Sequence, residues 1–122
     1  MTWKFTDEKP VYQQIIEKIQ DAVLIGEFPA GSKFPSVREI AANARVNPNT
    51  MQHALQELER QQLLVTMGTN GRYVTENEAV IKEAKEQRIK SLTEECVKKF
   101  EALGVSSHQA AGFLMQYGNR KE

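Results

Sequence analysis

The segment from residue 47 to residue 53 holds five polar side chains whose types suit hydrogen bonding to the edges of nucleic acid bases. They are Asn47, Asn49, Thr50, Gln52 and His53. An asparagine or glutamine amide donates and accepts at once, so it can bind adenine with two hydrogen bonds, and a threonine can contact the thymine methyl. Solubility alone is better served by Glu and Lys. The segment therefore indicates a base-reading surface, although each residue taken alone also fits an ordinary solvated side chain.

A helix that begins at Asn47 would place these side chains on one face. Asparagine is a preferred N-cap, and Pro48 suits the first helical position. Large apolar residues then recur at helical spacing and predict the face that is buried. They are Met51, Ala54, Leu55 and Leu58. The polar residues consequently point outward near the amino-terminal end of the helix.

A shorter helix is expected directly before this one. Ser36 and Glu39 have the spacing of a capping box, which marks the start of a helix. Apolar residues continue at helical spacing up to Ala44, and Arg45 lies in the turn that follows. Two short helices joined by a tight turn form a helix-turn-helix.

A β-hairpin is predicted after the second of these helices. Residues 63–67 and 72–75 are rich in apolar and β-favoured types, and residues 68–71 between them have a glycine at each end. We expect Gly71 to adopt a positive φ in this turn. A hairpin directly after a helix-turn-helix forms a wing. The alternative interpretation is a small domain of the same elements without a role in nucleic acid binding.

Further candidate contacts flank the base-reading face. Arg38 can reach a phosphate or a guanine, and Arg45 suits a phosphate. Side chains at the wing suit the DNA backbone or the minor groove. The full set of candidate DNA-binding residues is Ser36, Arg38, Arg45, Asn47, Asn49, Thr50, Gln52, His53, Thr69, Asn70 and Arg72.

The amino-terminal part supplies a scaffold. Pro10 precedes an amphipathic pattern that predicts a helix from Val11 to Ile25, which Gly26 ends. Residues 1–9 form an extended lead-in, and Trp3 within it lies either against a partner copy or over the core of its own domain.

The carboxy-terminal part reads as two helices. Asn77 caps a long helix from Glu78 to Leu103, and a second capping box at Ser106 starts another. About 45 residues are too few to form an independent core, so we expect their apolar stripes to pack on the wing domain or on another copy. Homodimerisation is our interpretation, because dimers match two half-sites of DNA. The expected interface residues are Ile89, Leu92, Cys96, Phe100, Leu103, Phe113 and Leu114.

The predicted fold class is therefore mainly α with a small β-hairpin. Residues 1–76 are expected to form a winged helix-turn-helix DNA-binding domain, and residues 77–122 a helical dimerisation segment. The formal net charge is zero, and residues 33–75 contain five basic and three acidic side chains. Non-specific DNA binding should be weak, since it depends on phosphate neutralisation. This weakness favours a competing hypothesis, a winged helix that binds proteins.

Several other classes are disfavoured. His53, Cys96 and His108 lack the spacing of metal ligands, and no phosphate loop or nucleophile motif is present, so we expect neither a metal, a cofactor nor an enzyme. A lone cysteine gives no sign of an oxidising compartment. No apolar run has the length of a membrane span or of a signal peptide, and a cytoplasmic location is expected.

Three segments together resemble a known family. They are Phe34-Pro-Ser-Val-Arg-Glu-Ile-Ala41, Val46-Asn-Pro-Asn-Thr50 and Leu58 to Val74. They resemble the DNA-binding domain of the GntR family of bacterial transcription regulators over about residues 10–76. The Asn-Pro-Asn-Thr segment and the short carboxy-terminal part resemble its YtrA-like branch.

The resemblance implies a dimeric repressor of an operon that contains its own gene and, as a further expectation, a transporter. It also implies a small effector, for which we consider a site near Phe100, Phe113 and Tyr117. Aromatic residues at this spacing equally suit a core.

Overall fold

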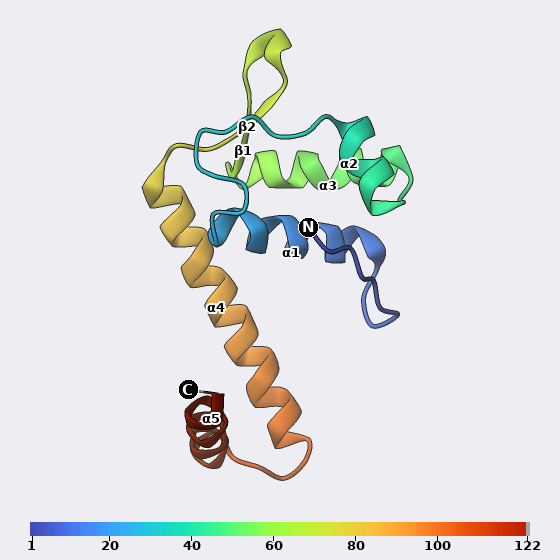
Figure 1. Ribbon diagram of the computed structural model, residues 1–122. Coiled ribbons are helices and arrows are strands. Elements are labelled where there is room, and N and C mark those ends of the chain that lie inside the picture. Colours follow the sequence, from blue (N-terminus) through green and yellow to red (C-terminus); the bar gives the residue numbers. More distant parts are fainter. Residues whose placement is uncertain (122) are drawn as a thin grey trace. The chain divides into compact units, whose positions relative to one another are not determined.

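The computed structural model describes the backbone of residues 1–121 and the side chains of residues 1–120. It is mainly helical with one two-stranded antiparallel sheet, which confirms the predicted fold class (Figure 1). The elements in chain order are α1 (Val11–Leu24), α2 (Val37–Ala44), α3 (Pro48–Arg60), β1 (Leu64–Thr66), a single 3-10 turn (Gly68–Asn70), β2 (Arg72–Val74), α4 (Glu78–Glu101) and α5 (Ser107–Lys121). The helices α1 and α4 end slightly before the predicted residues Ile25 and Leu103.

The chain forms two compact units, residues 1–84 and residues 85–122, which we call the head and the tail. This division by packing falls inside α4, whereas the division by function that the sequence predicts after residue 76 stays a prediction. Its physical reason is packing, because Val80, Ile81 and Ala84 lie against the core of the head. The first two turns of α4 therefore belong structurally to the head.

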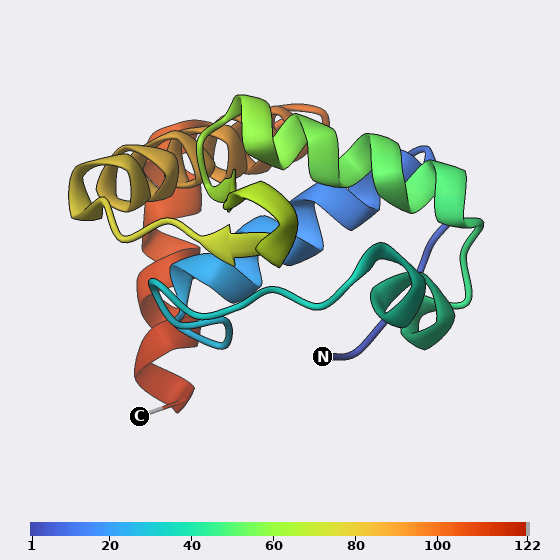
Figure 2. The same ribbon diagram turned by 90° about the horizontal axis from the view of Figure 1, so that it is seen from above.

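The core of the head is built around α3, which contacts α1, α2 and β1. The predicted apolar stripe of α3 is confirmed, since its members are completely buried. Figure 2 shows α3 beside both the hairpin and α1. The largest fully buried side chains are Ile15, Ile19, Met51, Leu55, Leu58, Leu63, Leu64 and Val74. A tightly packed core of this kind holds α3 at a fixed position and so fixes the direction of its polar face.

The hairpin is short and is tied to the chain that precedes α2. Thr66 pairs with Arg72 in the antiparallel register, and Lys33 forms an isolated bridge with Tyr73. The Phe34 amide donates to the Arg72 carbonyl at 2.8 Å. Gly71 has φ 92° and ψ −157°, a region that is almost restricted to glycine. The expected positive φ at this turn is thus confirmed.

The lead-in of residues 1–9 lies against its own head. The Trp3 Nε1 group donates to Asn43 Oδ1 of α2 at 2.9 Å, and the Trp3 and Phe5 rings stack with centroids 6.0 Å apart. Lys18 of α1 places its Nζ 5.9 Å from the centre of the Phe5 ring. Of the two interpretations of Trp3, the structure supports a ring that covers the core of its own domain.

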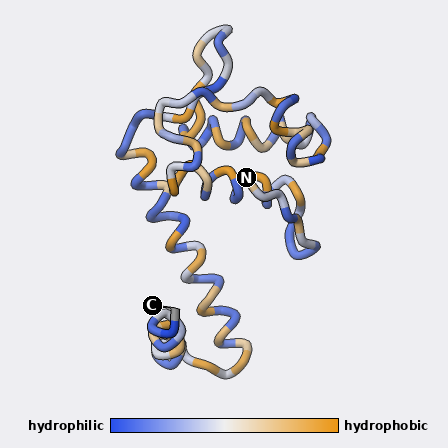
Figure 3. Tube along the Cα trace, viewed as in Figure 1, coloured by the Kyte–Doolittle hydropathy of each residue, from blue (hydrophilic) through white to orange (hydrophobic). Residues whose placement is uncertain are grey.

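The tail is organised differently from the head. The predicted capping box is present, because the Gln109 amide donates to Ser106 Oγ at 3.2 Å and the Ser106 amide to Gln109 Oε1 at 3.0 Å. Among the described side chains of the tail, only that of Ala110 is buried. Figure 3 shows hydrophobic residues recurring along α4. No helix within residues 1–121 combines the length and the apolar character that crossing a membrane requires.

Candidate nucleic-acid interface

The amino-terminal end of α3 is fixed by its cap. Asn47 has an extended backbone, and its Oδ1 accepts a hydrogen bond from the Asn49 amide at 2.7 Å. Pro48 occupies the first turn, as predicted. The Asn47 Nδ2 group remains able to donate, and the unpaired backbone N–H groups of this first turn favour an anion.

Asn49 and His53 lie on the face of α3 opposite its buried stripe, and Thr50 and Gln52 lie on the flanks of that stripe. Asn49 and His53 are exposed, while Thr50 and Gln52 are half-buried. Each of these four can therefore be reached from solvent at the end of the helix that enters a groove in a helix-turn-helix protein. The geometry agrees with the predicted base-reading face and leaves its contacts to DNA as a prediction.

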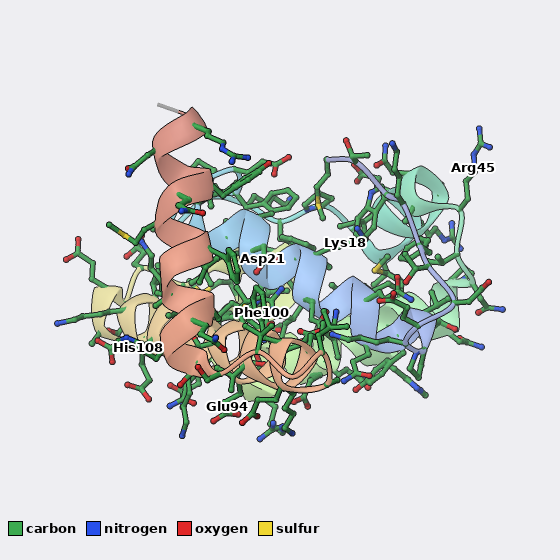
Figure 4. All side chains as sticks on the ribbon, turned by 90° about the horizontal axis from the view of Figure 1, so that it is seen from below. Lys18, Asp21, Arg45, Glu94, Phe100 and His108 are labelled. Atoms are coloured by element: carbon green, nitrogen blue, oxygen red, sulfur yellow. The ribbon has the colours of Figure 1, made fainter. Side chains whose placement is uncertain are left out.

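The turn between α2 and α3 presents a positive charge. Ser36 caps α2 by accepting a hydrogen bond from the Glu39 amide at 3.2 Å. Arg45 closes α2 in the left-handed conformation, with φ 58° and ψ 46°. Figure 4 shows its side chain extending away from the turn. Arg38 and Arg45 are both exposed, so each guanidinium is available to a phosphate.

A groove of about 820 Å³ separates the beginning of α2 from the wing. It brings together four of the predicted residues, namely Ser36, Thr69, Asn70 and Arg72. Lys33 also lines this groove and was absent from the sequence-based set. Its side chain reaches the wing, because its Cε would lie 3.8 Å from a Cβ built on Gly71. The pairing of Lys33 with Tyr73 is a tertiary contact, and the local sequence carries no signal for it.

Ion pairs divide the basic residues of the interface into two groups. Arg60 binds Glu57 through Nε at 2.8 Å and through a terminal nitrogen, and Arg72 binds Glu59 at 2.5 Å. Within the described part of the chain, no ion pair is found for Lys33, Arg38 or Arg45. Among the five basic residues between positions 33 and 75, these three are therefore the ones with a charge that is free to neutralise a phosphate.

The two glutamates of these pairs are stabilised in their ionised form. The hydrogen bond from Arg60 holds the pKa of Glu57 below its ordinary value. Partial burial raises the pKa of Glu59, but the hydrogen bonds from Thr66 and Arg72 outweigh it and the net direction is downward. Both carboxylates are therefore charged at neutral pH and keep their arginines engaged.

The tail contains a separate apolar groove of about 350 Å³ between α4 and α5. It is lined by Leu92, Cys96 and Leu114 of the predicted interface, together with smaller residues. The aromatic residues considered for an effector, Phe100, Phe113 and Tyr117, do not line it. Within the described residues, no cluster of His, Cys, Asp or Glu could hold a metal ion.

Comparison with known proteins places these features in a family. Residues 11–74 match the family described as "Bacterial regulatory proteins, gntR family". The HTH-type transcriptional regulator YhcF of Bacillus subtilis is 33% identical over 106 residues, which is 87% of this chain and 88% of YhcF. The HTH-type transcriptional repressor YtrA of Bacillus subtilis is 43% identical over 68 residues, which is 56% of this chain and only 52% of YtrA.

A solved structure extends the similarity to nearly the whole fold. The GntR family transcriptional regulator from Listeria monocytogenes superposes with a TM-score of 0.83 at 34% identity, over 92% of this chain and 98% of that one. These relatives are transcription regulators rather than enzymes, in agreement with the expectation from the sequence. The chain belongs to the GntR family of bacterial transcription regulators.

Proposed function

We propose that this protein is a homodimeric repressor that binds a specific double-stranded operator in the promoter of its own operon. The observation that carries the proposal is the exposed polar end of α3, which lies in the same head as a wing and three unpaired cations. A surface with amides at its centre and cations around it suits base readout framed by phosphate contacts. The repressor role is supported by the similarity to YtrA, which is named as a repressor.

The proposed contacts differ in kind. Asn49 and Gln52 specify bases, and Thr50 and His53 complete the surface that enters the major groove. Arg38 and Arg45 bind phosphates, and Ser36 and Asn47 donate to phosphates at the starts of their helices. Thr69 and Asn70 place the wing tip on the backbone or in the minor groove. Lys33 joins the phosphate contacts because it lines the same groove.

Dimerisation through the tail is the second part of the proposal. The predicted interface side chains are largely uncovered, with Leu103 80% exposed, Leu114 58% exposed and Phe113 54% exposed. A second copy of the same helices would remove these surfaces from water, and each large apolar side chain buried contributes roughly 1.5–3 kcal/mol. We assign residues 1–76 to DNA binding and residues 77–122 to dimerisation, with a small effector acting on the dimer.

The deciding experiment is a binding titration of the purified protein on the promoter of its own gene, with a scrambled duplex of equal length and composition as the control. We expect the promoter to bind at least about 10³-fold more tightly, which is the lower end of specific recognition. Selection of bound sites from random DNA should return an inverted repeat with half-sites about one helical turn apart. Equal affinity for both duplexes would support the competing protein-binding winged helix instead.

A repressor of this kind acts in the cytoplasm, where the bacterial chromosome lies.

A further inference from the structure

The carboxylate of Glu59 connects the recognition helix to both strands of the wing. Its Oε2 accepts a hydrogen bond from the Thr66 hydroxyl of β1 at 2.7 Å, and its Oε1 accepts one from Arg72 Nε of β2 at 2.5 Å. Thr66 and Arg72 are also cross-strand partners in the hairpin. One side chain from the last turn of α3 thus holds the final paired position of the wing from both sides.

This contact should matter for the stability of the wing because of its position within a short hairpin. Each strand has only three residues, and an isolated two-stranded hairpin of this size is marginally stable. The base of the hairpin is held by the buried residues Leu64 and Val74. Beyond Thr66 and Arg72 lies the turn, which the Met67 amide closes by donating to the Gly71 carbonyl at 2.9 Å. The contact to Glu59 therefore joins α3 to the hairpin at its last strand residues, next to the turn.

The exposure of Arg72 agrees with a structural role for this side chain. It is 16% exposed, and a charge-assisted hydrogen bond already engages its Nε group. By contrast, Arg60, the last residue of α3, forms its ion pair within that helix and is 73% exposed. The Arg60 pair therefore joins two residues of one helix, whereas the Arg72 pair joins α3 to β2.

We propose that Glu59 is a positioning residue of the DNA-binding head, which sets the direction of the wing through Thr66 and Arg72. We call these two contacts of Glu59 the brace. In this proposal Arg72 belongs to the brace and does not contact phosphate. The inference rests on the proposed operator binding and extends it to a residue that would not touch DNA. It assigns an acidic side chain a favourable role in binding a polyanion.

The direction in which one substitution changes DNA affinity distinguishes this brace from simple electrostatics. Glu59→Gln removes a negative charge from the DNA-binding head, and electrostatics alone predicts tighter binding to every duplex. Loss of the brace predicts the opposite on the operator, about a ten-fold weaker affinity, because charge-assisted hydrogen bonds that fix the wing are weakened. Glu57→Gln is the matched control, since it makes the same charge change on the same helix and weakens contacts to Arg60 and Gln61, neither of which lies in the wing.

A second variant tests the other half of the brace without changing charge. Thr66→Val keeps a β-branched residue in β1 and removes only the hydroxyl that donates to Glu59. We expect about a three-fold weaker operator affinity and an unchanged dependence on salt. Unchanged operator affinity of both Glu59→Gln and Thr66→Val would overturn the inference.

A double-mutant cycle decides the role of Arg72. If Arg72 acts only through Glu59, Arg72→Gln should weaken operator binding in the wild-type background and have little effect when Glu59 is already Gln. A full additional loss in that background, with the salt slope reduced by about one per half-site, would show that Arg72 binds phosphate and would overturn the inference.

Hydrogen exchange of the free protein tests the contacts of Glu59 without DNA, and so independently of the proposed function. Glu59→Gln should speed exchange at the Thr69 and Asn70 amides while the amides of α1 keep their protection. If the wild type shows no operator preference, the proposed function is wrong. If the wild type prefers its operator, and Glu59→Gln and Thr66→Val both bind it as tightly as the wild type does, only the inference about Glu59 is wrong.

Discussion

The head and the tail are both largely helical, yet they satisfy their apolar residues in different ways. In the head, three helices and a hairpin enclose a core in which Ile15, Met51 and Leu55 are completely buried. In the tail, two helices leave Leu103, Phe113 and Leu114 more than half exposed. The head encloses a core of its own, whereas the tail leaves apolar side chains uncovered, as the proposed dimer interface requires. The two units differ already in their helices, since α1, α2 and α3 are strongly amphipathic whereas α4 and α5 are only weakly so.

The largest effect should come from a charge placed in the tail. Leu92→Glu introduces a carboxylate into the apolar groove of α4 and α5, where burial against a second copy would leave it unpaired. We expect a monomer in sedimentation and a loss of about 10²–10⁴ in operator affinity, since linked heads bind the second half-site at a high effective concentration. Lys90→Glu adds the same carboxylate at a polar position of α4 and should stay dimeric. A wild type that sediments as a monomer at micromolar concentration would remove the basis of this prediction.

Core truncations should distinguish the two units by their dependence on protein concentration. Leu55→Ala deletes a fully buried side chain of the head and should reduce the free energy of unfolding by about 2–5 kcal/mol at any concentration. Leu114→Ala in the tail should reduce stability mainly at low concentration, where dimers dissociate. Chemical denaturation over a hundred-fold range of about 0.1–10 μM would measure both. Equal concentration dependence of the two variants would erase the distinction between head and tail.

Within the head, base-reading residues should differ from anchoring residues. Asn49→Ala and Gln52→Ala should each cost about 1–3 kcal/mol on the operator and relax the preference at one position of each half-site. Arg45→Ala should weaken all duplexes alike and reduce the salt slope by about one per half-site. With Lys33, Arg38 and Arg45 as the proposed phosphate contacts of each head, the wild-type dimer should show a slope of about −5. Binding to operator variants at several salt concentrations tests these expectations. An intact site preference in both amide variants would refute the recognition role of α3.

The smallest effect concerns acid. The pKa of Glu57 and of Glu59 is lower in the folded head than the ordinary 4.5, so both carboxylates add stability above that value. This contribution is lost as the pH falls from about 4.5 through the lowered values, because the unfolded chain then binds the protons first. Urea unfolding at about pH 6 and about pH 4 should show the head losing stability, and the combined Glu57→Gln and Glu59→Gln variant should lose less. If that variant loses as much stability as the wild type does, groups other than Glu57 and Glu59 cause the acid sensitivity.

The sequence predicts those parts of the head that depend on local signals. The Asn47 cap, the buried stripe of α3 and the positive φ of Gly71 all follow from residue type and spacing. The brace from Glu59 was not predictable, because its partners lie seven and 13 residues away on strands whose orientation relative to α3 is a tertiary property. Lys33 was missed for the same reason.

The division within α4 was also outside the reach of local signals. The helix passes from head to tail without a Pro or Gly, so only packing separates the residues before Ala84 from those after it. The contacts of the candidate DNA-binding residues remain predictions, since the geometry fixes where each side chain lies and the titrations above establish what it binds.

The attachment of the lead-in to α2 has a practical consequence. Trp3 is the sole tryptophan of the chain, and its indole nitrogen is bonded to Asn43 of the helix that precedes the recognition helix. The protein thus contains an intrinsic fluorophore at the rear of its helix-turn-helix, whose emission reports on the packing of α2 without any label. The amino group of Met1 also forms an ion pair with Glu27 at 3.2 Å. A purification tag belongs at the other end of the chain, because an amino-terminal extension would replace this charge beside the fluorophore.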